Sequence, residues 1–171
     1  LQPCSVLGVD FSASAVDFCR SNHRQEGLQF RQGDAEALPC ADNSFDAVLN
    51  VESSHCYPSL QRFVSEVFRV LRPGGHFLWA DLCRTELLDE NRSLFQAAGF
   101  TLLRETRITD NVLLALDRVQ EQRSAMIRRL VPRFLTRPVA DFAGVPGSRV
   151  YESLRAGEVQ YVSRVLIKPA A

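Results

Sequence analysis

The sequence contains almost no lysine: of its twenty basic residues only Lys168 is a lysine, and all the others are arginines. A phosphate-binding loop, a Schiff base to a substrate and the Tyr-x-x-x-Lys pair of short-chain dehydrogenases each require a lysine within the domain. The sequence therefore excludes these three mechanisms for nearly the whole chain.

Net charge, long apolar runs and paired cysteines are missing as well. Twenty acidic residues balance the twenty basic ones, so the overall charge gives no sign of a nucleic-acid partner. No apolar run approaches the ~18 residues that a membrane span requires. The five cysteines form no C-x-x-C pair. Their odd number and wide spacing favour a reducing, cytoplasmic location.

What the sequence does contain is an alternation of short apolar runs and amphipathic segments, which is typical of an α/β domain with a mostly parallel sheet. Its 171 residues are enough for one domain with a substantial core. We expect strands at 5–9, 28–31, 45–51, 76–82, 100–107 and 159–167. We expect helices at 12–21, 58–71, 87–98 and 112–131, an irregular segment at 138–147, and a helical turn at 151–155.

The segment from Phe45 to Leu82 reads as a strand, a helix and a second strand, and its crossover should be right-handed. The apolar run at 47–51 is typical of a parallel strand that is covered on both faces. Pro58 suits the first helical position, and the sequence Arg72-Pro73-Gly74-Gly75 should end the helix in a tight turn. Ligands of open parallel sheets sit at the carboxyl ends of the strands. We therefore expect chemistry on the loop at 50–57.

Two acidic residues, Asp10 and Asp34, each follow an expected strand. An acid at the first of these places accepts hydrogen bonds from ribose hydroxyls in dinucleotide-type folds, and the second could accept from an adenine amino group. Asp10 could instead cap a helix beside Ser12, and Asp34 could form a turn after Gly33. Because the two acids close successive strands, together they favour an adenosine site.

His55 lies on the loop that leaves the central strand, beside the expected cofactor cleft. A histidine near its ordinary pKa is a suitable general base at neutral pH. The alternative is that His55 only braces the loop before Pro58. Trp79, within an apolar strand, is expected in the core.

Four stretches together resemble the class I S-adenosylmethionine-dependent methyltransferases, in the group of methyltransferase type 11 domains. Within that fold, NVESSHCYP followed by LRPGG is similar to the mycobacterial phthiotriolone dimycocerosate methyltransferases and their relatives, which are small-molecule O-methyltransferases. The resemblance covers nearly the whole chain. The four stretches are GVDFS at 8–12, RQGDAEALP at 31–39, SFDAVLNVES at 44–53 and VFRVLRPGGHFLWADL at 67–82.

The resemblance implies S-adenosyl-L-methionine as cofactor and assigns residues by position. Asp10 corresponds to the acid that binds the ribose hydroxyls, and Phe11 lies beside the adenine. Asp34 and the backbone of Ala35 correspond to the adenine contacts. The strand end beneath the methionine portion and the methyl group corresponds to Asn50 and Val51.

One departure from the family pattern is large: the first strand and the glycine-rich loop after it should lie upstream of Leu1. We therefore expect residues 1–171 to form a single, partial methyltransferase domain with a Rossmann-like α/β sheet. The strands ending at Val9 and Val51 should flank a gap, because the absent strand normally lies between them. Residues 110–157, before the last strand, should cover the substrate.

The sequence thus predicts transfer of a methyl group from S-adenosyl-L-methionine to a hydroxyl of a lipid-like or polyketide-like small molecule, with His55 as the base. Two alternatives remain open. A degenerate or truncated methyltransferase-like protein would act through protein contacts, without catalysis. A nicotinamide-dependent dehydrogenase would use the same acid after its second strand, although GDAE and LRPGG are against it.

Overall fold

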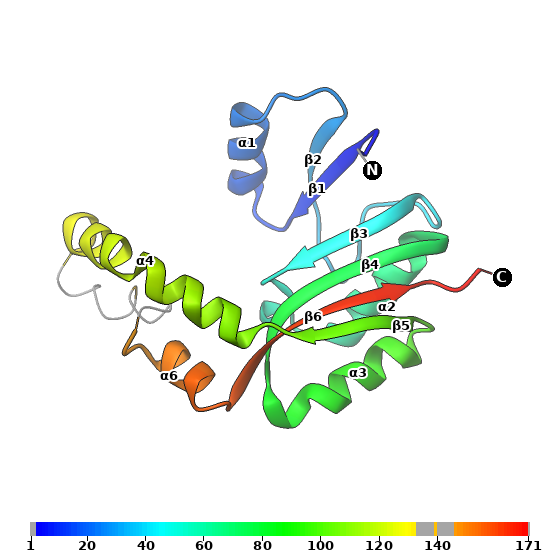
Figure 1. The fold of residues 1–171 in the computed structure, drawn as a ribbon. Coiled ribbons are helices and arrows are strands. Elements are labelled where there is room, and N and C mark those ends of the chain that lie inside the picture. The colour runs from blue at the N-terminus through cyan, green and yellow to red at the C-terminus, as the bar shows by residue number, and fades with distance from the viewer. Residues whose placement is uncertain (1–2, 133–138, 140–145, 171) are drawn as a thin grey trace.

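The computed structural model describes residues 3–132, 139 and 146–170. Helices and strands alternate along the chain as the sequence predicts (Figure 1). The strands are β1 (Val6–Asp10), β2 (Leu28–Gln32), β3 (Phe45–Val51), β4 (Leu71–Arg84), β5 (Thr101–Arg107) and β6 (Val159–Ile167). The α-helices are α1 (Ala13–Asn22), α2 (Leu60–Val70), α3 (Leu88–Ala97), α4 (Thr109–Leu130) and α6 (Arg149–Arg155), and short 3₁₀ turns lie at Ser54–Cys56 and Thr85–Leu87.

The strands form two separate sheets, one of two strands in the order β1-β2 and one of four in the order β3-β4-β6-β5. The pairs β1-β2 and β3-β4 are parallel. Strand β6 is the exception to the mostly parallel arrangement that the sequence predicts, since it runs antiparallel to both β4 and β5. The cause is the path of the chain: β6 begins at Val159 opposite Arg84, at the edge where β4 and β5 end. A strand that starts at that edge must run in the opposite direction.

The expected gap between the strands ending at Val9 and Val51 is confirmed, since β1 and β3 belong to different sheets. In Figure 1 the unit of β1, α1 and β2 lies beyond β3, at the open side of the larger sheet. The prediction that the central strand is buried on both faces is wrong. Leu49 is 70% exposed and Val51 is 56% exposed, because β3 is an edge strand and helices α2 and α3 pack against the opposite face.

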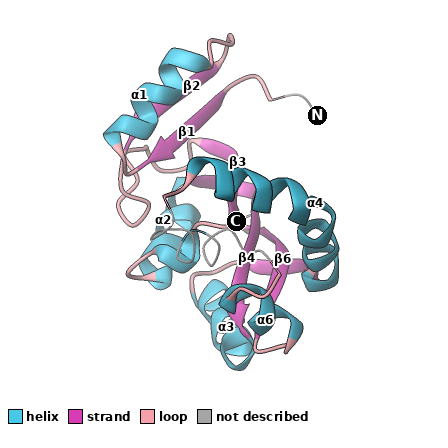
Figure 2. Cartoon of the chain, turned by 90° about the vertical axis from the view of Figure 1, so that its left-hand side faces the viewer, coloured by secondary structure: helices cyan, strands magenta, loops and turns pink. Residues whose placement is uncertain are grey.

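The core of the larger sheet lies between β4, β6 and the two helices α2 and α3. On α2 the side chains of Phe63, Val64 and Val67 recur at helical spacing and are at most 3% exposed. On the sheet, Phe77 and Trp79 face them. Trp79 is 3% exposed, in agreement with its expected place in the core. Figure 2 shows α1 beside β1 and β2, apart from the helices of the larger sheet.

Two details of the central unit differ from the prediction. Pro58 does not begin the helix: Ser59 is the N-cap, and its hydroxyl accepts a hydrogen bond from the Arg62 amide at 3.2 Å. The turn expected at 72–75 is present as an interruption inside β4, because Phe45 pairs with Leu71 whereas the pairing resumes at His76. At the start of α2 a serine hydroxyl accepts a hydrogen bond from one of the free backbone amides. A proline at the first helical position accepts none and only lacks its own N–H.

The remaining elements match the prediction within a few residues. Gly99 follows α3 with φ of +102°, the left-handed conformation expected after a helix. The irregular segment expected at 138–147 lies outside the described residues except for 139, 146 and 147. Within the described ranges, no helix combines the length and the hydropathy needed to cross a membrane.

Candidate functional site

The most polar part of the larger sheet is a cluster built by the loop after β3 and the end of β4. Glu52 has φ of +50°, so the chain bends sharply as it leaves β3 and enters the 3₁₀ turn at Ser54–Cys56. That turn places His55 over Asp81 of β4. The distance from His55 Nδ1 to Asp81 Oδ1 is 2.7 Å, and the His55 amide donates to Asp81 Oδ2 at 3.1 Å.

The Asp81 side chain has no solvent exposure, although it sits at the end of a strand. A buried carboxylate is costly unless hydrogen bonds replace its water. Asp81 accepts two bonds from His55, one from the Ser54 hydroxyl at 2.6 Å and one from the Leu82 amide at 2.8 Å. These bonds fix the carboxylate, and the carboxylate in turn fixes the imidazole.

The imidazole of His55 is anchored at one nitrogen and accessible elsewhere. Its side chain is 32% exposed, against 0% for Asp81. When Nδ1 donates to a carboxylate, the lone pair of the neutral ring lies at Nε2. The arrangement presents a ring nitrogen that can accept a proton from a group at the sheet edge.

Ser54 completes this cluster but does not make it a hydrolase triad. Its hydroxyl donates to Asp81 and accepts from the Trp79 indole at 2.8 Å. In a serine hydrolase the hydroxyl is hydrogen-bonded to the imidazole that takes its proton. Here the hydroxyl supports the carboxylate, so Ser54 is not an activated nucleophile.

A second polar group lies at the same strand end. Asn50 donates from Nδ2 to the Tyr57 hydroxyl at 3.1 Å, and the Ser53 hydroxyl lies 2.7 Å from that same oxygen. The Asn50 Oδ1 atom is buried and has no partner within the described part of the chain. It is therefore an acceptor that no donor of the described residues uses. Val51, the next residue, points to the other face of the sheet and is 56% exposed.

The predicted adenosine residues are on the smaller sheet. Asp10 ends β1 and accepts a hydrogen bond from the Ser12 amide at 2.7 Å. Asp34 accepts one from the Glu36 amide at 2.8 Å. Asp34 thus also serves its local turn, as the alternative interpretation proposed, whereas the N-cap of α1 is Ser12 and not Asp10. Both residues are exposed, and Phe11 is 76% exposed.

Hydrogen bonds bring the ends of β1 and β2 together. The Gly33 amide donates to the Asp10 carbonyl at 3.0 Å, and Gln32 Nε2 donates to the Phe11 carbonyl at 3.1 Å. Asp10 and Asp34 therefore share one sheet edge. Ala35, the next residue, packs against the core of the larger sheet. The adenosine residues and the His55 cluster lie on different sheets, joined by the loop at 33–44.

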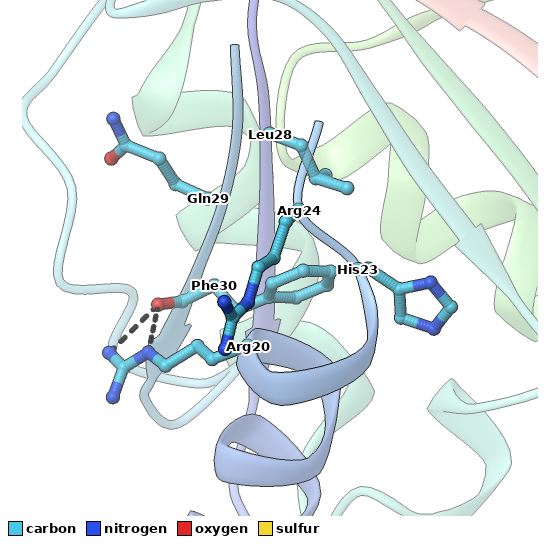
Figure 3. A pocket seen from close by; sticks show the side chains of 6 residues that line it. All are labelled: Arg20, His23, Arg24, Leu28, Gln29 and Phe30. Carbon is cyan, nitrogen blue, oxygen red and sulfur yellow. Dashed lines mark hydrogen bonds between the residues drawn. The ribbon is translucent and has the colours of Figure 1, made fainter. Parts of the chain in front are cut away.

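A surface cavity of about 350 Å³ lies elsewhere, between the end of α1 and β2 (Figure 3). Because α1 runs back from the carboxyl end of β1, its last turn lies at the opposite edge of the smaller sheet. In the cavity Arg20 already donates to the Phe30 carbonyl from two nitrogens, at 3.1 and 2.9 Å. This cavity is therefore separate from the predicted cofactor edge. It is lined by Arg20, His23, Arg24, Leu28, Gln29 and Phe30.

Sequence reasoning missed Asp81, although a signal was present. It is the only acidic residue in the run His76 to Leu82, which is otherwise apolar apart from His76 itself. A carboxylate inside a strand of a buried sheet requires a partner. Among the described residues no group of three histidine, cysteine or acidic side chains could hold a metal ion.

Comparison with known proteins finds methyltransferases among the similar sequences. Residues 1–79 match the family described as a methyltransferase domain. The chain is 39% identical over 161 residues to a phthiotriol/phenolphthiotriol dimycocerosates methyltransferase of Mycobacterium tuberculosis, covering 94% of this chain and 60% of the relative. Residues 1–79 thus match the methyltransferase domain, and the similarity to methyltransferases extends over nearly the whole chain. A fatty-acid O-methyltransferase of Mycolicibacterium smegmatis is 37% identical over 169 residues, covering 99% of this chain and 61% of the relative.

Solved structures agree on the fold, which is that of the Rossmann-like class I methyltransferases. A putative sarcosine dimethylglycine methyltransferase from Galdieria sulphuraria superposes with a TM-score of 0.81 at 16% identity, over 96% of this chain and 70% of its own. The [4+2]-cyclase SpnF superposes with a TM-score of 0.77 at 22% identity, over 98% and 67%. The chain spans about 60% of the length of the curated relatives described above.

Proposed function

We propose that this chain binds S-adenosyl-L-methionine and supports methyl transfer to a hydroxyl group of a lipid-like small molecule. The curated relatives are named for phthiotriol lipids and for fatty acids, which supports a lipid-like acceptor. Polyketide-derived lipids fall within the same class. The five cysteines are free thiols, in keeping with a reducing, cytoplasmic location, which we include in the proposal.

The residues at the strand ends suit this cofactor. Asp10 and Asp34 are exposed carboxylates on one sheet edge, and ribose hydroxyls and an adenine amino group are donors that they could bind. Phe11 and the backbone of Ala35 would contact the adenine. Asn50 and Val51 would lie beneath the methionine portion, which the unpartnered Oδ1 of Asn50 supports. When bound, the cofactor supplies an electrophilic methyl group on a sulfonium.

The observation that carries the proposal is the buried bond between His55 and Asp81. His55 would take the acceptor's hydroxyl proton at Nε2. The methyl group would pass to the acceptor oxygen as its bond to the sulfonium sulfur breaks, and the cofactor would leave as a neutral thioether. Asp81 stabilises the imidazolium that results, and the proton later leaves to solvent. General-base catalysis of this kind is typically worth about 10²–10⁴ in rate.

The same pair distinguishes the two acceptor types suggested by the relatives. A carboxyl group has a pKa near 4 and is already ionised at neutral pH, so it needs no base. An alcohol keeps its proton at that pH and is a poor nucleophile without one. An oriented, accessible imidazole therefore favours a hydroxyl acceptor over a fatty-acid carboxylate.

Binding and transfer are tested in turn on this chain. Titration calorimetry with S-adenosylhomocysteine should show binding, and Asp10→Ala should weaken it by roughly 1–3 kcal/mol, the loss for a charged acceptor. Transfer is then measured with methyl-labelled cofactor and two matched acceptors, a long-chain alcohol and the fatty acid of equal length. We expect His55→Ala to abolish most methylation of the alcohol. Equal rates for wild type and variant would contradict the role of His55.

A non-catalytic role is the second candidate. The observation in its favour is that β1 and β3 belong to different sheets and that the β3 face exposes Leu49 and Val51. Such surfaces suit contacts with another protein. A chain that folds but shows no affinity for S-adenosylhomocysteine would support this role and contradict the enzymatic one.

The segment at 110–157 is proposed to cover the acceptor. Its helices α4 and α6 are joined by the Tyr151 hydroxyl, which donates to Asp117 at 2.6 Å. They lie at the end of the sheet toward which β3 and β5 point in Figure 1. This is the side of the larger sheet that carries His55, so the position supports a covering role.

A further inference from the structure

The loop at 33–44 is the covalent connection between the two sheets, and arginines from both sides hold its middle. Three successive carbonyls accept hydrogen bonds from guanidinium groups. Arg69 of α2 donates to the carbonyls of Leu38 at 3.0 Å and Cys40 at 2.8 Å. Arg31 of β2 donates to the carbonyl between them, that of Pro39, at 2.6 Å.

On the side of the larger sheet, Arg69 is itself fixed. Glu66, one turn earlier on α2, binds it with both oxygens, at 2.8 Å to Nε and 2.7 Å to Nη2. Glu66 also accepts a bond from the Leu38 amide at 2.7 Å. Asp42 of the loop adds a 2.6 Å contact to Arg69. These charge-assisted bonds lower the pKa of Glu66, mainly through its hydrogen bond with Arg69, and they are among the stronger hydrogen bonds in proteins.

The held segment also contacts the smaller sheet at the place where Asp34 lies. A Cβ atom on Gly33 would lie 2.7 Å from the Pro39 ring and 3.0 Å from the Val9 side chain. The loop therefore folds back tightly over the ends of β1 and β2. Pro39 therefore packs directly against Gly33, the residue before Asp34.

We propose that Arg69 and Glu66 form a clasp that sets the position of the β1–α1–β2 unit against the larger sheet. Since β1 and β3 share no strand pairing, the clasp positions the two sheets relative to each other, which hydrogen bonds between strands do in a continuous sheet. Resting on the proposed function, this makes Arg69 a positioning residue: it fixes the distance between the adenosine residues Asp10 and Asp34 and the base His55.

The clasp is tested first by hydrogen exchange, without any cofactor. In Arg69→Gln the amides of β1 and β2 should exchange about tenfold faster or more, the loss expected for charge-assisted bonds. The amides of β4 and β6 should keep their wild-type rates. Arg62→Gln is the matched control, because Arg62 lies on the same helix, 77% exposed and 4.0 Å from Glu36. It should leave both sets unchanged.

Two outcomes would overturn the clasp: unchanged exchange in β1 and β2, or equal acceleration in both sheets, which is what loss of overall stability produces. Arg69→Lys keeps the charge near Glu66 but cannot reach two carbonyls and two carboxylate oxygens as a fork. We expect it to fold and to show an intermediate acceleration confined to the smaller sheet.

A second readout separates the clasp from the proposed function. If the chain binds S-adenosylhomocysteine, Arg69→Gln should weaken binding about tenfold at a temperature where the variant is folded, and Arg62→Gln should not. If the wild-type chain does not bind S-adenosylhomocysteine, the proposed function fails. The hydrogen-exchange result still shows whether Arg69 and Glu66 hold the smaller sheet in place. Wild-type affinity in Arg69→Gln would contradict its positioning role.

Discussion

Asp81 shows how one side chain can organise a site. It is fully buried, and every hydrogen bond it accepts comes from the loop that carries His55 or from its own strand. The orientation of the imidazole therefore depends on a residue that no ligand needs to touch. Ser54 is part of that support, because its hydroxyl connects the carboxylate to the Trp79 indole.

We expect Ser54→Ala to destabilise the chain by about 1–3 kcal/mol, since it leaves a buried indole and part of a buried carboxylate without a partner. Urea unfolding measures the effect. Ser65→Ala is the control, because the Ser65 hydroxyl only bonds to the Gln61 carbonyl on the exposed side of α2. A loss no larger than that of the control would show that Ser54 does not support Asp81.

An ion pair joins strands β6 and β5, and its arginine is fully buried. Arg164 has a fully buried side chain and lies over the rings of Trp79 and Phe95, at 5.1 and 5.2 Å. It donates to Glu105 of β5 at 2.8 Å. Glu105 also binds Arg92 of α3, and these bonds, chiefly the one to Arg92, lower the pKa of Glu105.

A carboxylate whose pKa is lowered by folding stabilises the folded state at any pH above the pKa that it has in the unfolded chain. This contribution is lost as the pH falls through the pKa of the folded state. We therefore expect Glu105→Gln to cost about 3–5 kcal/mol at neutral pH, as for a broken buried pair. The cost should shrink in acid, where wild type is protonated too. Unfolding at pH 7 and at a pH below the folded pKa, beside the exposed control Glu86→Gln, checks this. A cost independent of pH would contradict the account.

Most elements were predictable because their signals are local. The apolar stripe of α2, the Ser12 cap of α1 and the left-handed Gly99 after α3 depend on neighbouring residues only. The direction of β6 and the pairing of His55 with Asp81 depend on residues 26 or more positions apart. Local patterns do not encode such contacts, which is why His55 could be proposed as a base while its partner was missed.

The molecule as a whole has two units held by polar contacts, with an apolar strand face beside the open edge. Edge strands with exposed apolar side chains favour self-association. Leu49, 70% exposed on β3, is the clearest example.

We expect Leu49→Lys to reduce association at high concentration, because a charge on an edge strand opposes pairing with another chain. Its effect on stability should stay within about 0.5 kcal/mol, as for most surface changes. Light scattering across a concentration series measures the association. Leu114→Lys on α4, where Leu114 is 50% exposed, is the control; an equal reduction by both variants would show that the β3 edge is not the cause.

In the proposed reaction Asp81 holds His55 as the base for methyl transfer to a hydroxyl. The most direct test is the rate of labelled methyl transfer to the long-chain alcohol by Asp81→Asn, measured with melting temperature and S-adenosylhomocysteine affinity. An asparagine amide can donate to Nδ1 and so place the proton on Nε2, the wrong nitrogen. The account predicts a rate lower by about 10²–10⁴ in a folded variant that binds S-adenosylhomocysteine as wild type does. A wild-type rate in that variant would contradict it.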